Sequence, residues 1–220
     1  MSLVIAMDGP SGSGKSSASK GVARALGLRY LDTGAMYRAM TWWMLNQGVP
    51  VEDGEAVAAR AAEPVIVSGT DPDGPSIAVD GADVSGPIRT REVTNAVSAV
   101  SSVPAVRSRL VELQREIIGS GGIVVEGRDI GTVVAPDAPV KVYLTASAQA
   151  RAARRAKDLA ADPGASVTVT QAEQERRDRL DSTRKASPLT KAAGAQEIDS
   201  TQLSLSEVVE AVVRLAKEHE

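Results

Sequence analysis

A glycine-rich segment directly after a short apolar run is the feature that most restricts how this chain can fold. Residues 9–16 read GPSGSGKS and match the pattern G-x-x-x-x-G-K-[ST] without a gap. The apolar residues 3–7 predict a buried strand before the motif, and residues 15–26 have helical periodicity after it. A strand, a phosphate-cradling loop and a helix in this order predict an α/β fold that binds a purine nucleoside triphosphate.

The elements that follow predict a parallel sheet with helices on both faces. We expect further sheet strands at residues 28–31, 123–125, 140–144 and 196–198. We expect helices at residues 35–47, 52–62, 90–102, 104–118, 147–161, 170–185 and 206–217. Thr170-x-x-Glu173 is a capping box at the start of the helix at 170–185. With the first strand this gives a five-stranded parallel sheet in a three-layer α/β/α domain spanning residues 1–220.

The sequence pattern changes from helical to short alternating segments at about residues 63–88. Short alternating strands are expected at residues 65–67 and 77–79, and turn-forming residues 70–75 separate them. A second turn is expected at Asp80-Gly81. This segment is therefore predicted to be a small β-rich insertion in the α/β domain.

Composition excludes several classes of protein. The chain has no cysteine and a single histidine, His219, which excludes disulfides, thiolate metal centres and His-based catalytic triads. Its net charge of −3 and its aromatic content of 2% argue against a nucleic-acid partner. Its apolar start ends at Asp8 and no apolar run reaches the ~18 residues of a membrane span, so we expect a cytoplasmic protein without a membrane partner.

The chemistry of the glycine-rich loop is specific to polyphosphate. Its glycines let backbone N–H groups turn inward around the phosphates, and Lys15 places a positive charge on the β and γ oxygens. The hydroxyl of Ser16 is available to Mg²⁺, and Ser17 is close enough to compete for that role. No Asn-Lys-x-Asp base reader accompanies the loop, and the chain is small, which favours phosphoryl transfer to a small molecule.

Arginines recur where an anionic acceptor would bind. Arg128 and Asp129 follow the strand at 123–125, at the end of the sheet where ligands bind. Two sets lie at helical spacing on one face each, although such sets are more often exposed, salt-bridged surfaces. They are Arg177, Asp181 and Arg184, and Arg151, Arg154 and Arg155.

Six segments in a fixed order carry a resemblance to a known family. They are DGPSGSGKS (8–16), LDTGAMYR (31–38), DVSGPIR (83–89), EGRDIGT (126–132), RDRLDSTR (177–184) and IDST (198–201). Together they closely resemble the bacterial cytidylate kinases, which are P-loop nucleoside monophosphate kinases, over essentially the whole chain. The resemblance implies transfer of the γ-phosphoryl group of ATP to CMP and dCMP with the help of Mg²⁺. The sequence does not fix the oligomeric state, and a monomer is our default expectation.

The resemblance also implies roles for individual residues. The ATP phosphates would be held, with Mg²⁺ on Ser16, by Gly9, Pro10, Ser11, Gly12, Ser13, Gly14, Lys15, Ser16 and Ser17. The acceptor nucleotide would be bound by Thr33, Tyr37, Arg38, Ser98, Arg107, Arg128, Asp129, Arg177, Asp181 and Arg184. Transfer would be assisted by Lys15, Arg128, Arg154 and Arg184.

Three of these residues, Ser98, Arg107 and Asp129, would read the cytosine edge, with Asp129 accepting from the 4-amino group. Position 33 is a threonine where the family pattern often has serine. Residues 63–98 would form the lobe that binds the nucleoside monophosphate, and residues 148–170 would form a lid. Two alternatives remain open from the residues alone. One is another small P-loop kinase that acts on UMP, AMP, shikimate or dephospho-CoA, and the other is a nucleotide-binding regulator without turnover.

Overall fold

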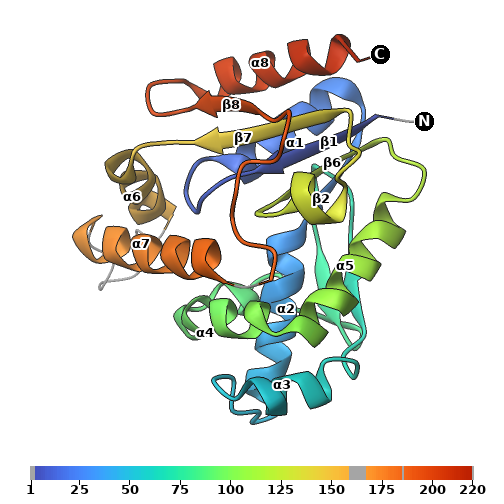
Figure 1. The fold of residues 1–220 in the computed structure, drawn as a ribbon, viewed down its shortest axis with the longest axis vertical. Helices are drawn as coiled ribbons and strands as arrows, with labels where there is room; N and C mark the ends of the chain where they lie inside the picture. Colours follow the sequence, from blue (N-terminus) through green and yellow to red (C-terminus); the bar gives the residue numbers. More distant parts are fainter. Residues whose placement is uncertain (1–2, 159–166, 185, 220) are drawn as a thin grey trace.

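The computed structural model describes residues 3–158, 167–184 and 186–219, and its centre is a five-stranded parallel sheet (Figure 1). The strand order is β2-β6-β1-β7-β8, and every neighbouring pair is parallel. The strands are β1 (Val4–Asp8), β2 (Arg29–Asp32), β6 (Ile123–Gly127), β7 (Val140–Thr145) and β8 (Gln196–Asp199). The predicted fold class and the five predicted strands are confirmed.

Helices cover both faces of this sheet and create a core on each. Helices α1 (Lys15–Leu26) and α8 (Leu205–Lys217) pack together on one face, whereas α2 (Thr33–Asn46) and α5 (Pro104–Ile118) lie on the other (Figure 1). Side chains alternate along β1, so Ile5 and Met7 join the core under α1 and α8 while Ala6 joins the core under α2. The parallel strands are therefore buried on both sides, which explains their continuous apolar sequence.

The predicted β-rich segment is a small antiparallel sheet beside α2. Its strands are β3 (Ile66–Ser68), β4 (Ile77–Val79) and β5 (Ala82–Asp83), in the order β3-β4-β5. The expected turn at Asp80-Gly81 joins β4 to β5 with positive φ angles of 51° and 82°. The Asp80 carboxylate accepts a hydrogen bond of 2.9 Å from Trp43 Nε1, which ties this turn to α2. Helix α3 (Gly54–Arg60) precedes the sheet, and the 3₁₀ turn η1 (Pro87–Arg89) and helix α4 (Arg91–Ser102) follow it.

The carboxyl ends of the strands face helices α6 (Ala148–Asp158) and α7 (Val167–Thr183), which lie beyond the edge of the sheet (Figure 1). A π-helical turn, η2 (Ile130–Val134), follows β6 directly. The sequence did not predict this turn, because its residues IGTVV have no amphipathic period. None of the helices within the described ranges is long and apolar enough to span a membrane.

Several predicted element boundaries were wrong. Helix α2 begins at Thr33 instead of Ala35, because Asp32 caps it by accepting a hydrogen bond of 2.9 Å from Ala35 N. Helix α7 begins at Val167, before the expected capping box at Thr170, and ends at Thr183, so Arg184 lies just beyond the helix. The predicted helix 147–161 extends into residues 159–166, which lie outside the described residues, as do the side chains of residues 155 and 170.

Candidate active site

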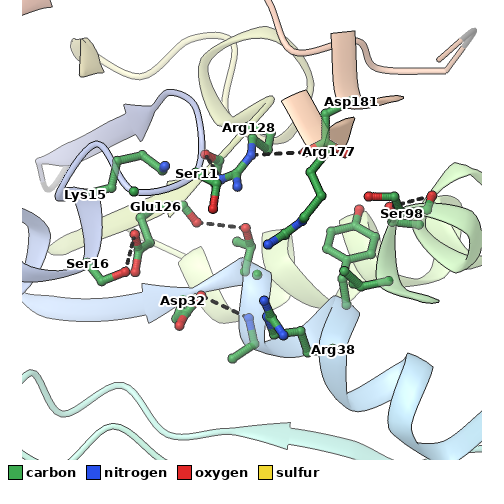
Figure 2. Close-up of a pocket in the computed structure, with 18 of the residues that line it drawn as sticks. Ser11, Lys15, Ser16, Asp32, Arg38, Ser98, Glu126, Arg128, Arg177 and Asp181 are labelled. Carbon is green, nitrogen blue, oxygen red and sulfur yellow. Dashed lines mark hydrogen bonds and ion pairs between the residues drawn. The ribbon is translucent and has the colours of Figure 1, made fainter. Parts of the chain in front are cut away.

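A cavity of about 520 Å³ opens at the carboxyl ends of β1, β2 and β6. Figure 2 shows Lys15 and Ser16 toward one end of it and Ser98 toward the other, with Arg128 and Arg177 between them. Every residue predicted to bind the acceptor lines this cavity, and so do Lys15, Arg154 and most of the glycine-rich loop. Three predicted loop residues do not line it, and they are Gly9, Pro10 and Ser13.

The glycine-rich loop adopts a conformation that requires its glycines. Gly9, Gly12 and Gly14 have φ angles of +146°, +78° and +93°, which other residues rarely adopt. A Cβ atom on Gly9 would lie 2.1 Å from the carbonyl oxygen of Leu144 on β7. The loop therefore packs against the neighbouring strand with no room for a side chain, which fixes its path over the end of the sheet.

Lys15 is the first residue of α1 and is only 6% exposed. Its Nζ donates a hydrogen bond of 2.7 Å to the carbonyl oxygen of Pro10. Burial, and then the neighbouring positive charge of Arg128, lower the pKa of Lys15 below its usual value. A polyphosphate beside Lys15 would stabilise its charged form, so this group is poised to bind an anion.

A buried acidic residue lies under the first turn of α1. Glu126 on β6 accepts a hydrogen bond of 3.0 Å from Ser16 Oγ and a further one from the hydroxyl of Tyr30. Burial, and then the negative charge of Asp32, raise the pKa of Glu126 above its usual value. Because Ser16 donates its proton to Glu126, the lone pairs of its oxygen remain available to a cation.

Thr33 also bonds to this part of β6. Its Oγ1 donates a hydrogen bond of 2.7 Å to the main-chain oxygen of Glu126. Binding of a phosphate oxygen by this hydroxyl would therefore require the hydroxyl to rotate, because a phosphate oxygen needs a donor. The threonine nevertheless lines the cavity, as expected for the position where the family pattern often has serine.

The opposite end of the cavity holds a buried ion pair between Arg107 and Asp129, whose side chains are 5% and 6% exposed. The guanidinium of Arg107 also lies over the ring of Tyr37, 5.2 Å from its centre. Burial raises the pKa of Tyr37 to about 12, so its hydroxyl stays protonated at neutral pH. Ser98 Oγ and Arg107 Nε are buried without a hydrogen-bond partner within the described part of the chain. Such polar atoms at a cavity are suited to bind a polar ligand.

Arginine side chains and one aspartate connect the two ends of the cavity. Arg128 Nε lies 3.3 Å from Asp181 Oδ2, and Arg184 reaches Asp181 and Asp129 at 3.9 Å and 3.8 Å. Burial, and then the charge of Arg107, lower the pKa of Arg184. The burial and the neighbouring cation disfavour the charged form of Arg184, and an anionic ligand would offset that cost.

Two further arginines that were predicted to bind the acceptor, Arg38 and Arg177, line the cavity. Arg38 donates hydrogen bonds of 2.9 Å to Thr94 Oγ1 and 3.2 Å to the carbonyl oxygen of Ile88, which holds it against η1 and α4. Arg177 on α7 points toward the cavity between its two ends (Figure 2). Both therefore reach the cavity from elements outside the central sheet.

The expected cluster Arg151, Arg154 and Arg155 on α6 divides in the structure. Arg154 lines the cavity and donates to the carbonyl oxygens of Ser13 and Ser200 at 3.2 Å and 2.6 Å. Arg151 does not line the cavity, because it donates to the carbonyl oxygen of Ser11 at 3.0 Å and pairs with a carboxylate of α7. The side chain of Arg155 lies outside the described residues. Helix α6 therefore contacts the glycine-rich loop directly.

Three acidic residues at the carboxyl ends of strands contribute to the site without having been assigned a role from the sequence. Asp8, Asp32 and Glu126 come from β1, β2 and β6 respectively, and all are buried or half-buried. Their signal was present, because a polar residue that ends an apolar parallel strand lies at the ligand-binding edge of the sheet. Ser200, which follows β8, could not be found this way, because it acts by accepting a hydrogen bond from Arg154, which lies on another element.

A phosphate-cradling loop with a buried lysine, facing an arginine-lined cavity at the strand ends, defines a P-loop phosphotransferase. The fold agrees, because a shikimate kinase from Acinetobacter baumannii superposes with a TM-score of 0.51 over 100% of this chain and 96% of that one, at 14% identity. The family model described as "Cytidylate kinase" matches residues 5–218. The chain belongs to the cytidylate kinase family.

Relatives named cytidylate kinase are similar along nearly their whole length. The protein from Streptomyces coelicolor is 60% identical over 218 residues, which are 98% of this chain and 93% of the relative. The one from Streptomyces griseus is 58% identical with the same coverage. The one from Mycobacterium avium is 54% identical over 94% of this chain and 92% of its own length.

Proposed function

We propose that this enzyme transfers the γ-phosphoryl group of ATP to CMP and dCMP, forming ADP with CDP or dCDP. The observation that carries the proposal is that one continuous cavity joins the glycine-rich loop at one end to the buried Arg107–Asp129 pair at the other. The loop suits a triphosphate, and the ion pair suits a polar base edge. The family to which the chain belongs supports the same reaction.

The chemistry of the Arg107 end favours cytosine. The carboxylate of Asp129 can accept from the 4-amino group, and the guanidinium of Arg107 can donate to O2 and N3. Ser98, whose Oγ is buried without a partner in the described residues, can complete the set. Uracil carries an oxygen at position 4, which would face the Asp129 carboxylate without a proton between them. A buried polar site of this kind disfavours an acceptor that leaves its groups unpaired.

The donor set fits Mg²⁺ bound together with phosphate. Ser16 would hold the ion, because its hydroxyl proton is donated to Glu126 and its oxygen can act as a ligand. Among the described residues no group of three or more His, Cys, Asp or Glu side chains could hold a metal. A Mg²⁺ ion that keeps few protein ligands and uses substrate phosphates matches this set. When bound, Mg²⁺ would neutralise charge on the transferring phosphoryl group.

The chain's own residues supply positioning and charge. The acceptor's phosphate oxygen is already anionic, so attack on the γ-phosphorus requires no general base. Lys15, Arg128, Arg154 and Arg184 line the cavity and are proposed to cancel the charge that develops during in-line transfer. Arg38 and Arg177 are proposed to hold the acceptor phosphate, and Asp181 to accept from its ribose.

The peripheral segments are proposed to close the site. Residues 63–98 would form the acceptor-binding lobe, and residues 148–170, of which 159–166 lie outside the described residues, would form a lid that excludes water during transfer. Arg154 on α6 supports this role, because it already contacts the glycine-rich loop. We propose a cytoplasmic monomer without a nucleic-acid partner, and the net charge of −3 and the aromatic content of 2% support the absence of a nucleic-acid partner.

The experiment that tests the proposal measures ADP release from ATP and Mg²⁺ with CMP, dCMP, UMP, AMP, GMP and shikimate as acceptors. Fast turnover with CMP and dCMP alone is the expected result. Fast turnover with another acceptor instead would refute the assignment of the base-reading residues. ATP binding without turnover of any acceptor would refute the enzymatic role.

A variant refines the same experiment. Asp129→Ala should lower kcat/KM for CMP by at least about 100-fold, because a buried polar contact to the base is lost, while the affinity for ATP stays within about threefold. Asp137→Ala is the matched control, since Asp137 lies eight residues away on an exposed loop outside the cavity and should leave both values unchanged. Equal losses of CMP use and ATP affinity in Asp129→Ala would contradict a base-reading role.

A further inference from the structure

Asp8, the last residue of β1, makes a contact that the reaction described above does not use. It is 3% exposed, and both of its carboxylate oxygens accept hydrogen bonds from the main chain after β6. Oδ1 accepts from Ile130 N and Oδ2 from Gly131 N, each at 2.8 Å. These two amides begin η2, directly after Arg128 and Asp129 in the chain.

The N-terminus of a helical turn has main-chain N–H groups without partners inside the turn. The residue before the turn usually accepts from them with its own side chain, and aspartate is well suited to do so. Asp129 occupies that position for η2, yet its side chain makes no such bond within the described residues. It pairs instead with Arg107 across the cavity. The carboxylate that would normally cap the turn is therefore directed to the ligand-binding side.

We propose that Asp8 is a positioning residue that caps η2 from the neighbouring strand and so leaves the Asp129 carboxylate free to face Arg107 and the acceptor base. The expected consequence of this cap, recognition of cytosine, rests on the proposed function. Asp8 does not itself line the cavity, so we expect it to act through the main chain of residues 129–131.

The topology makes this cap possible. Strands β1 and β6 are neighbours, and Asp8 pairs in register with Gly127. The Asp8 side chain therefore lies beside the first residues after β6, 122 positions away in sequence from Ile130. Asp8 also directly precedes Gly9, so one residue borders both the triphosphate loop and the segment assigned to the acceptor base.

The chemistry of the contact calls for a carboxylate. Both donors are main-chain N–H groups, so both side-chain atoms facing them must be acceptors. An asparagine would turn its NH₂ group toward one of the two N–H donors and lose that bond. The pKa of Asp8 is raised to about 6 by burial, while its two N–H donors and Lys15 favour the ionised form and Asp129 opposes it. At pH 8 the side chain is ionised and accepts at both oxygens.

The test compares Asp8→Asn with the unaltered enzyme at pH 8. In Asp8→Asn we expect Asp129 to turn back toward the uncapped amides and leave Arg107. The KM for CMP should then rise by about tenfold or more, the magnitude expected for loss of a hydrogen bond to a charged group, and the preference for CMP over UMP should fall similarly. The KM for ATP should change by less than about threefold, because the glycine-rich loop keeps its contacts.

Asp53→Asn is a control for the same substitution at a cap away from the cavity. A single oxygen of Asp53, Oδ1, accepts from two successive main-chain amides at the start of α3, Glu55 N at 3.0 Å and Ala56 N at 3.2 Å, so an asparagine can keep both bonds. It does not line the cavity, so its variant should keep both KM values. If Asp8→Asn raises both KM values equally, or changes neither, the positioning role is wrong.

A second measurement does not depend on a variant or on the identity of the acceptor. Hydrogen exchange of the unaltered protein should show the amides of Ile130 and Gly131 among its slowly exchanging groups. Fast exchange of both amides would overturn the proposal even if Asp8→Asn failed to fold. Turnover of an acceptor other than CMP, with both amides protected, would instead refute the proposed function and leave the cap in place.

Discussion

Variants of the buried pair between Arg107 and Asp129 can distinguish a role of this pair in folding stability from a role in substrate recognition. Its side chains are 5% and 6% exposed. Removing Asp129 takes away the carboxylate that pairs with the buried Arg107, and removing Arg107 leaves Asp129 with the more distant Arg184 at 3.8 Å. Such a loss costs about 3–5 kcal/mol in free energy of unfolding, whereas replacing both partners by apolar residues of similar volume is often close to neutral. Arg184 would retain Asp181 at 3.9 Å after either change, so the neighbouring charge stays paired.

The experiment therefore compares three variants with the unaltered protein: Asp129→Leu, Arg107→Met and the double variant. We expect each single variant to be less stable by about 3–5 kcal/mol, and the double variant to lie within about 1–2 kcal/mol of the unaltered protein. Urea unfolding followed by the fluorescence of the buried Trp43 measures these values. All three variants should lose at least about 100-fold in kcat/KM for CMP, because neither half of the pair can be replaced in reading the base.

The double variant distinguishes between a recognition role and a structural role of the pair. If it recovers stability without recovering CMP turnover, the pair is kept for recognition and not for folding. If it recovers both, the pair is a structural element and the cytosine-reading role is refuted. A double variant that is as unstable as the sum of the singles would show that the two charges do not interact in the folded protein, which would contradict the geometry itself.

Three further changes test other parts of the site. Lys15→Met should lower kcat by at least about 100-fold in the ADP-release assay with little loss of secondary structure by circular dichroism, because it removes a charge at the transferring group and keeps the apolar stem. Gly9→Ala should lower the free energy of unfolding by at least about 3 kcal/mol in urea, because its φ is +146° and its Cβ would lie 2.1 Å from Leu144 O; near-wild-type stability would refute the tight loop path. As the pH rises from 4 to 6, the free energy of unfolding of the unaltered protein should fall by up to about 3 kcal/mol relative to that of Asp8→Asn. Folded Asp8 keeps its proton up to a pKa of about 6, whereas the unfolded chain releases it near 3.8, so ionisation costs stability only in the folded protein. A stability difference that is constant over this pH window would contradict that shift.

The strands of the central sheet could be predicted because burial on both faces leaves a continuous apolar run between polar loops. No role was predicted for the polar residues that end the same strands. Strand β6 was expected to end at Val125, but its pairing with β1 continues through Glu126 and Gly127. An apolar pattern cannot detect a carboxylate that is buried at a strand end and accepts hydrogen bonds from Ser16 and Tyr30. Those partners lie about 100 residues away, so only the folded chain shows them.

The residues lining the cavity could be predicted more completely than their contacts. The resemblance selected Arg128, Asp129 and Arg184, and all three line the cavity. Local spacing alone could not select among the arginines of α6, because helical periodicity places Arg151 and Arg154 on the same face. The structure separates them through tertiary contacts, which hold Arg151 on the Ser11 carbonyl outside the cavity lining and Arg154 inside it.

The adjacency of β1 and β6 would allow one sheet edge to serve both proposed substrates. The glycine-rich loop leaves β1 at Asp8, and the segment with Arg128 and Asp129 leaves β6 at Gly127, its register partner. A Cβ on Gly127 would lie 2.7 Å from Thr33 Oγ1, so this strand end also packs against the start of α2. The separation between the proposed donor and acceptor sites would thus be set mainly by main-chain pairing, and only secondarily by flexible side chains. In-line transfer is sensitive to displacements of about 1 Å, and a rigid strand pair is the element best able to limit them.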